Sequence, residues 1–123
     1  MRALIVDDSR AIRAMVGRIM AELGFETIDA GDGRAALERL EQGPTPDVCL
    51  VDWNMPVMNG IEFVQALRAD PRWADVKVVM VTTETEVSQM VRALEAGANE
   101  YVMKPFTRDV IREKLGLLAL DVA

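Results

Sequence analysis

The sequence predicts an α/β fold in which a parallel five-stranded sheet lies between two layers of helices. Short, nearly continuous apolar runs occur five times along the chain, and a segment with helical apolar spacing follows each of them. Such runs are typical of strands buried on both faces, and repeated strand–helix units produce a parallel sheet. Right-handed crossovers then leave few strand orders compatible with this pattern.

The first half of the chain contains three expected strands and two expected helices. Strands are expected at residues 3–7 (ALIVD), 25–30 and 47–52 (DVCLVD). Asp8 and Ser9 are expected N-cap residues of the first helix, whose apolar spacing ends at Gly24. A turn at residues 31–33 precedes the second helix, which ends at Gly43 and Pro44.

The second half repeats the same units after a loop at residues 53–60 (WNMPVMNG). The third helix follows this loop and stops before Asp70 and Pro71. A strand at residues 77–82 (KVVMVT) leads to a helix that ends at Gly97, and a short strand at residues 100–103 leads to the last helix. Met15 and the other helix methionines are expected to pack in the core, Trp73 is expected to be peripheral, and Cys49 is interpreted as a core residue.

Composition excludes several classes of function. The 123 residues suit one domain, and 50% hydrophobic with 28% charged residues is a globular composition. No apolar stretch approaches the roughly 18 residues of a membrane span. The net charge of −6 argues against nucleic acid as a partner. One cysteine and no histidine exclude an intramolecular disulfide, a zinc site and an imidazole base. We therefore expect a cytoplasmic protein that binds neither membrane nor nucleic acid.

Polar residues follow four of the five expected strands. Asp7 and Asp8 come at the end of the first, Asp52 of the third, Thr82 of the fourth and Lys104 of the fifth. Sites in open parallel sheets form outside the carboxyl ends of the strands. If the strand order is 2-1-3-4-5, these residues form a single row.

Such a row has a chemical meaning. Two carboxylates about 4 Å apart repel by roughly 4 kcal/mol at an effective dielectric near 20, and Lys104 offsets only part of this. A divalent cation would offset more, and oxygen ligands without His or Cys suit Mg²⁺. The ammonium and the Thr82 hydroxyl are suited to phosphoryl oxygens, and Asp52 is best placed to form an aspartyl-phosphate.

At these residues the chain resembles the receiver domain of two-component response regulators, and most of all its single-domain chemotaxis members. The matching segments are IVDDS at residues 5–9, VDWNMPVMNG at 51–60, MVTTE at 80–84 and EYVMKPF at 100–106. Thr82 lies 30 positions after Asp52 and Lys104 lies 22 after Thr82, as the family pattern expects. The resemblance implies a flavodoxin-like fold with the order 2-1-3-4-5. It spans residues 1–123 as one receiver domain without an output domain.

The resemblance also implies a role for each residue of the row. Asp52 would accept the phosphoryl group, and Lys104, joined to Pro105 by a cis bond, would hold a phosphoryl oxygen. Asp8, Asp52 and the backbone carbonyl of Asn54 would ligate Mg²⁺, with Asp7 acting through a metal-bound water.

Further residues would switch and time the signal. Thr82 would move to the phosphoryl group and Tyr101 would turn inward after it. Together they would remodel the face made by the fourth helix, the fifth strand and the fifth helix. Asn54 and Glu84 would tune dephosphorylation, and their polar character predicts a short-lived phosphoryl state. Trp53, directly after Asp52, would report metal or phosphate binding.

The favoured function is therefore a signalling switch rather than an enzyme. A sensor histidine kinase would donate the phosphoryl group, and the flagellar motor switch is the leading partner. A phosphorelay shuttle or phosphate sink is the alternative. The protein is expected to be monomeric, with dimerisation on phosphorylation left open. A Mg²⁺-dependent aspartyl-phosphate phosphatase is disfavoured because Asn54 stands where a second acid is usual. A flavodoxin-like cofactor binder is disfavoured because acids replace a glycine-rich phosphate loop.

Overall fold

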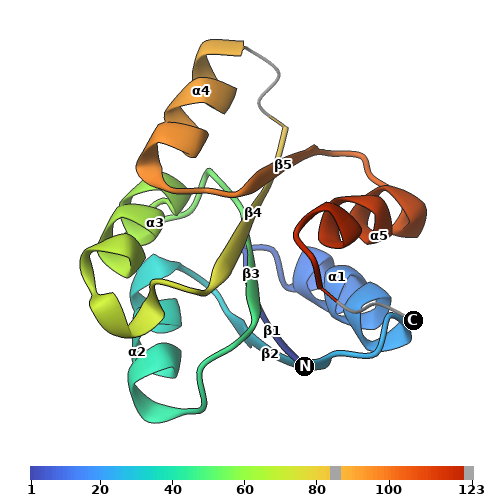
Figure 1. Ribbon diagram of the computed structural model, residues 1–123, viewed down its shortest axis with the longest axis horizontal. Helices are drawn as coiled ribbons and strands as arrows, with labels where there is room; N and C mark the ends of the chain where they lie inside the picture. Colours follow the sequence, from blue (N-terminus) through green and yellow to red (C-terminus); the bar gives the residue numbers. More distant parts are fainter. Residues whose placement is uncertain (84–86, 121–123) are drawn as a thin grey trace.

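Five parallel strands form one sheet in the computed structural model, which describes residues 1–83 and 87–120 (Figure 1). The strand order is β2-β1-β3-β4-β5, which confirms the expected flavodoxin-like order. The strands are β1 (Arg2–Val6), β2 (Glu26–Ala30), β3 (Val48–Val51), β4 (Lys77–Thr82) and β5 (Glu100–Met103).

Helices cover both faces of the sheet. On one side lie α1 (Arg10–Glu22) and α5 (Arg108–Leu117), and on the other lie α2 (Gly33–Gln42), α3 (Gly60–Ala69) and α4 (Val87–Ala96) (Figure 1). Alternate residues of each strand enter different cores. In β1, Leu4 and Val6 pack toward the α2–α4 side, whereas Ala3 and Ile5 pack toward the α1–α5 side. The sheet is thus buried on both faces, as its apolar strands predict.

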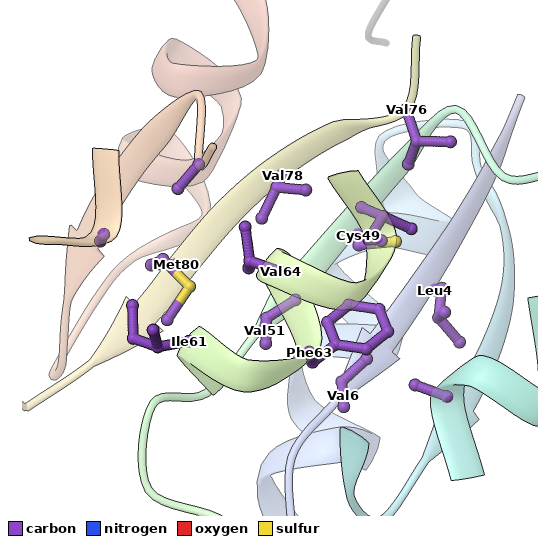
Figure 2. Packing of buried hydrophobic residues seen from close by; sticks show 14 of the residues in the cluster. Leu4, Val6, Cys49, Val51, Ile61, Phe63, Val64, Val76, Val78 and Met80 are labelled. Carbon is purple, nitrogen blue, oxygen red and sulfur yellow. The ribbon is translucent and has the colours of Figure 1, made fainter. Parts of the chain in front are cut away.

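Helix α3 packs directly on the centre of the sheet. Figure 2 shows Ile61, Phe63 and Val64 of α3 facing side chains of β1, β3 and β4. Phe63 and Val64 have no exposed surface. The neighbouring Cys49 is also fully buried, and burial raises the pKa of its thiol to about 12. The interpretation of Cys49 as a core residue is confirmed.

Several expected boundaries differ by one residue: β1 is observed at Arg2–Val6 and not at 3–7, and β3 at Val48–Val51 and not at 47–52. Three further differences, at the ends of helices, have a local reason. Phe25 is not in β2 because its N–H donates to the carbonyl of Met20 and closes α1. Asp32 accepts from the N–H of Ala35 and caps α2, so this helix begins within the expected turn. At α1, Ser9 alone is the N-cap.

Two packing expectations are wrong. Trp73 belongs to a short 3₁₀ helix, η1 (Pro71–Trp73), and only 5% of it is exposed, so it is a core residue and not a peripheral one. Met15 is 43% exposed although its position fits the apolar period of α1. Periodicity identifies a helical face but not how far the neighbouring elements extend over it.

Val57, in the loop between β3 and α3, has a backbone conformation that β-branched residues rarely adopt. Its φ is +67°, and the N–H of Met58 donates to the carbonyl of Pro56 across it at 2.7 Å. Since Val57 is 80% exposed, its side chain contributes little packing.

We expect Val57→Asn to raise the free energy of unfolding by about 1 kcal/mol in urea titrations, because Asn tolerates positive φ. Val57→Ile, which keeps the β-branch, should give no gain; an equal gain would contradict the explanation.

None of the helices within the described residues is both long enough and apolar enough to span a bilayer.

Candidate functional site

Backbone pairing places the polar residues of the predicted row at one edge of the sheet. The N–H of Asp7 donates to the carbonyl of Ala30 at 3.1 Å, and that of Asp52 donates to Val6 at 2.8 Å. The N–H of Lys104 donates to the carbonyl of Thr82 at 2.8 Å. The sheet pairing therefore continues one residue beyond the strands. These hydrogen bonds fix the backbone that carries the side chains of Asp7, Asp52 and Lys104.

Asp7, Asp8 and Asp52 form an acidic cluster at this edge. One carboxylate oxygen from each lies within 4.8 Å of the others. Asp7 and Asp52 are 4% and 7% exposed, whereas Asp8 is exposed. Three carboxylates that converge without a His or Cys form a donor set that suits a hard divalent cation such as Mg²⁺. The exposed Asp8 lies on the side that such an ion could reach from solvent.

Lys104 bridges the two buried acids of the cluster. Its Nζ lies 3.1 Å from Oδ2 of Asp7 and 3.3 Å from Oδ1 of Asp52. The other oxygen of Asp7, Oδ1, accepts from the N–H of Ser9 at 2.8 Å. One ammonium therefore serves two buried carboxylates, which leaves the cluster with excess negative charge.

The protonation equilibria of the site reflect this arrangement. Burial raises the pKa of Asp52 above its ordinary value, and the Asp7 charge raises it further, while Lys104 opposes both. Burial alone would lower the pKa of Lys104, but its hydrogen bond with Asp7 and the charge of Asp52 together raise it. Lys104 therefore stays charged at neutral pH. Because the pKa of Asp52 is raised by folding, ionisation of Asp52 lowers the free energy of unfolding.

The start of α3 lies directly beneath Asp52. Asn59 caps this helix in a reciprocal capping box with Glu62, and the N–H of Gly60 donates to the carbonyl of Trp53 at 2.9 Å. A Cβ at Gly60 would overlap the Asp52 carbonyl oxygen and would lie 3.0 Å from Trp53 Cα. The helix approaches the site so closely because Gly60 has no side chain.

The remaining predicted site residues lie in different surroundings. Thr82 ends β4 with no exposed surface, and Tyr101 in β5 is 6% exposed, so its ring is already inside. Asn54 is exposed. The peptide bond between Lys104 and Pro105 is cis, as expected. Glu84, the second tuning residue, lies outside the described residues.

Three residues near the site were not predicted from the sequence. The sequence pattern indicates Gly60 only as the end of a loop. Arg13 donates to the backbone carbonyl of Asp7, and the Arg92 guanidinium of α4 lies 5.8 Å from the centre of the Trp53 ring. Arg13 lies one helical turn after Ser9, so helix geometry could have indicated it. Nothing in the sequence pattern pairs Arg92 with Trp53.

A doubly wound sheet whose carboxyl edge carries three aspartates and a lysine is the arrangement expected of a receiver domain. The family model described as "Response regulator receiver domain" matches residues 3–116, and the chain belongs to this family.

Within the family, the chain is similar to chemotaxis proteins. It is 44% identical to the chemotaxis protein CheY of Pseudomonas aeruginosa over 94% of this chain and 93% of the relative. Identity to the chemotaxis protein CheY1 of Helicobacter pylori is 40%, over 94% of each chain. Among solved structures, CheY4 of Vibrio cholerae aligns with a TM-score of 0.89 at 36% identity, covering 95% of this chain and 97% of that one. The chain is thus a receiver domain similar to CheY proteins over nearly its whole length.

Proposed function

We propose that this protein is a chemotaxis response regulator that accepts a phosphoryl group on Asp52 from a sensor histidine kinase. The observation that carries the proposal is the bridging of Asp7 and Asp52 by Lys104, with Asp8 in the same cluster. This arrangement supplies a nucleophile, a cation for phosphoryl oxygens and a set of metal ligands at one point. The similarity to CheY proteins supports chemotaxis as the pathway.

Each residue of the cluster has a distinct part in the transfer. An Asp52 carboxylate oxygen forms a bond to phosphorus as the bond between phosphorus and the donor imidazole breaks, and the imidazole keeps the electron pair. Lys104 binds a phosphoryl oxygen. Asp8, Asp52 and the Asn54 carbonyl would hold Mg²⁺, and Asp7 would act through a water. The bound ion supplies positive charge against the charge that develops on the phosphoryl oxygens.

The modified domain then acts by protein contact and not as an enzyme with a separate substrate. Thr82 binds the phosphoryl group, Tyr101 packs behind it, and the face of α4, β5 and α5 changes its affinity for a partner. The favoured partner is the flagellar motor switch, and a phosphorelay shuttle or phosphate sink is the alternative. Residues 1–123 act as one receiver domain, monomeric before phosphorylation.

A motor-switch peptide should bind more tightly when beryllofluoride is present; unchanged affinity would favour the shuttle or sink.

The direct test is acetyl phosphate treatment followed by intact-mass measurement. Wild type should gain the mass of one phosphoryl group only with Mg²⁺, and Asp52→Asn should gain none, because an amide is not a comparable nucleophile. The exposed Asp75 provides a control, since Asp75→Asn should be modified like wild type. Equal modification of Asp52→Asn and wild type would refute Asp52 as the acceptor.

Mg²⁺ binding should change the fluorescence of Trp53, which is 8% exposed and lies next to Asp52. It should also stabilise the fold, by about 1.4 kcal/mol at tenfold excess over its dissociation constant. Both effects are measured by titrating Mg²⁺ into the wild type and into Asp8→Asn, which should bind more weakly. A fluorescence and a stability that do not respond to Mg²⁺ would contradict the assignment of a metal site.

A further inference from the structure

Arg13 of α1 lies against the acidic cluster but has no part in the proposed phosphoryl transfer. Its Nη1 donates to the backbone carbonyl of Asp7 at 2.7 Å, and its Nε forms an ion pair with Oδ2 of Asp29 at 2.8 Å. Only 18% of its side chain is exposed. Two short bonds from one planar guanidinium therefore fix it between the end of β2 and the peptide that joins Asp7 to Asp8.

We infer that Arg13 is a positioning residue for metal binding, which holds the Asp7–Asp8 peptide so that both carboxylates converge on Asp52. The inference rests on the proposed metal site. The direction of the Asp7 carbonyl fixes the backbone from which Asp8 projects. Because Asp8 is exposed, packing contributes little to the position of its carboxylate, and the backbone must supply the restraint.

The other polar groups of Asp7 show how complete this restraint is. Its N–H donates to Ala30, its Oδ1 accepts from Ser9 and its Oδ2 from Lys104. Arg13 holds the remaining group, the carbonyl. Partners of this kind, which orient metal-binding groups without touching the metal, commonly affect metal affinity strongly.

The charge of Arg13 does not argue against this role. The guanidinium binds the carbonyl of Asp7, whereas the carboxylate of Asp7 faces Ser9 and Lys104. Asp29 supplies a compensating negative charge at 2.8 Å. Arg13 therefore adds little net positive charge where a cation would bind.

The test measures binding of Mn²⁺, an oxygen-seeking ion whose free form gives a paramagnetic resonance signal. We expect Arg13→Ala to raise the dissociation constant of Mn²⁺ about tenfold. Asp29→Asn should raise it less, since it leaves the bond to the carbonyl, and Arg13→Lys should partly restore binding. Arg2→Ala is the matched control, because Arg2 forms a similar ion pair with Glu26 at the opposite end of β1 and β2, 3.2 Å long. It should bind Mn²⁺ like wild type.

The phosphorylation rate separates positioning from a general loss of structure. With near-UV circular dichroism showing each variant folded, Arg13→Ala should regain the wild-type acetyl phosphate rate once Mn²⁺ is saturating. Unchanged or tighter Mn²⁺ binding by Arg13→Ala would overturn the inference, as would equal weakening in Arg2→Ala. A wild type that binds Mn²⁺ but is never phosphorylated would refute the proposed function alone, because the dissociation constants still decide the role of Arg13.

Discussion

Gly60→Ala is expected to lower the free energy of unfolding by about 3 kcal/mol, because the new methyl group would overlap backbone atoms that have no room to move. The overlap is with the carbonyl oxygen of Asp52, at the end of a central strand, so relief requires α3 to shift away from the site. The same shift would displace the phosphoryl acceptor, so the rate of phosphorylation should also fall. Urea unfolding and acetyl phosphate labelling measure the two effects.

Gly116 provides the matched control for this substitution. It lies in α5, and among the residues that the structure describes, no atom outside the backbone of its own helix and its chain neighbours would lie within 4 Å of a Cβ there. Gly116→Ala should therefore raise stability by about 1 kcal/mol through helix propensity and leave phosphorylation unchanged. If the two substitutions changed the free energy of unfolding in the same direction, close packing beneath Asp52 would not explain the effect of Gly60→Ala.

Lys104→Met is the second substitution with a large expected effect. It removes the ammonium that lies between Asp7 and Asp52, and the two buried carboxylates then repel each other without compensation. We expect a loss of about 2 kcal/mol in Mg²⁺-free buffer at neutral pH, somewhat less than for a fully buried pair because Lys104 retains some exposure. Mg²⁺ should reduce this loss, because the cation replaces the missing charge.

The pH dependence of Lys104→Met should have a definite sign. The pKa of Asp52 is already raised in the folded wild type, and removal of Lys104 should raise it further. As pH falls through that pKa, the folded variant takes up a proton at Asp52 that the unfolded chain does not yet bind. The free energy of unfolding of the variant therefore rises toward acid pH, and the loss caused by the substitution shrinks. Lys114→Met is the control, since its partly exposed pair with Glu100 should contribute no more than about 1 kcal/mol. A loss that grows toward acid pH would contradict the explanation.

The fold and the main site residues could be predicted from the sequence because both depend on short-range patterns. Strand β4 is observed at Lys77–Thr82 and β5 at Glu100–Met103, as expected, since apolar runs with sharp ends define them. Asp7, Asp52 and Lys104 could be placed together because polar residues that follow adjacent parallel strands meet at one edge.

Contacts that depend on long side chains or on tertiary packing could not be predicted. Trp73 follows a proline in a polar segment, yet it is buried because η1 folds back against α3. Helix geometry places Arg13 near the site, but its hydrogen bond to the Asp7 carbonyl depends on a rotamer, which apolar periodicity does not record. Phe25 has strand propensity, but its N–H is taken by the end of α1.

The burial of Cys49 makes this thiol a reporter of opening. Alkylating reagents react with thiolates, and a fully buried thiol whose pKa is about 12 presents almost none. Cys49 lies in β3, and its side chain packs in the core on the α2–α4 side of the sheet, so a reagent reaches it only when these helices separate from the centre of the sheet. Because the chain has no other cysteine, the rate of alkylation in native buffer measures that separation without denaturant or added label. A cysteine introduced on the surface could likewise be derivatised while Cys49 stays unmodified.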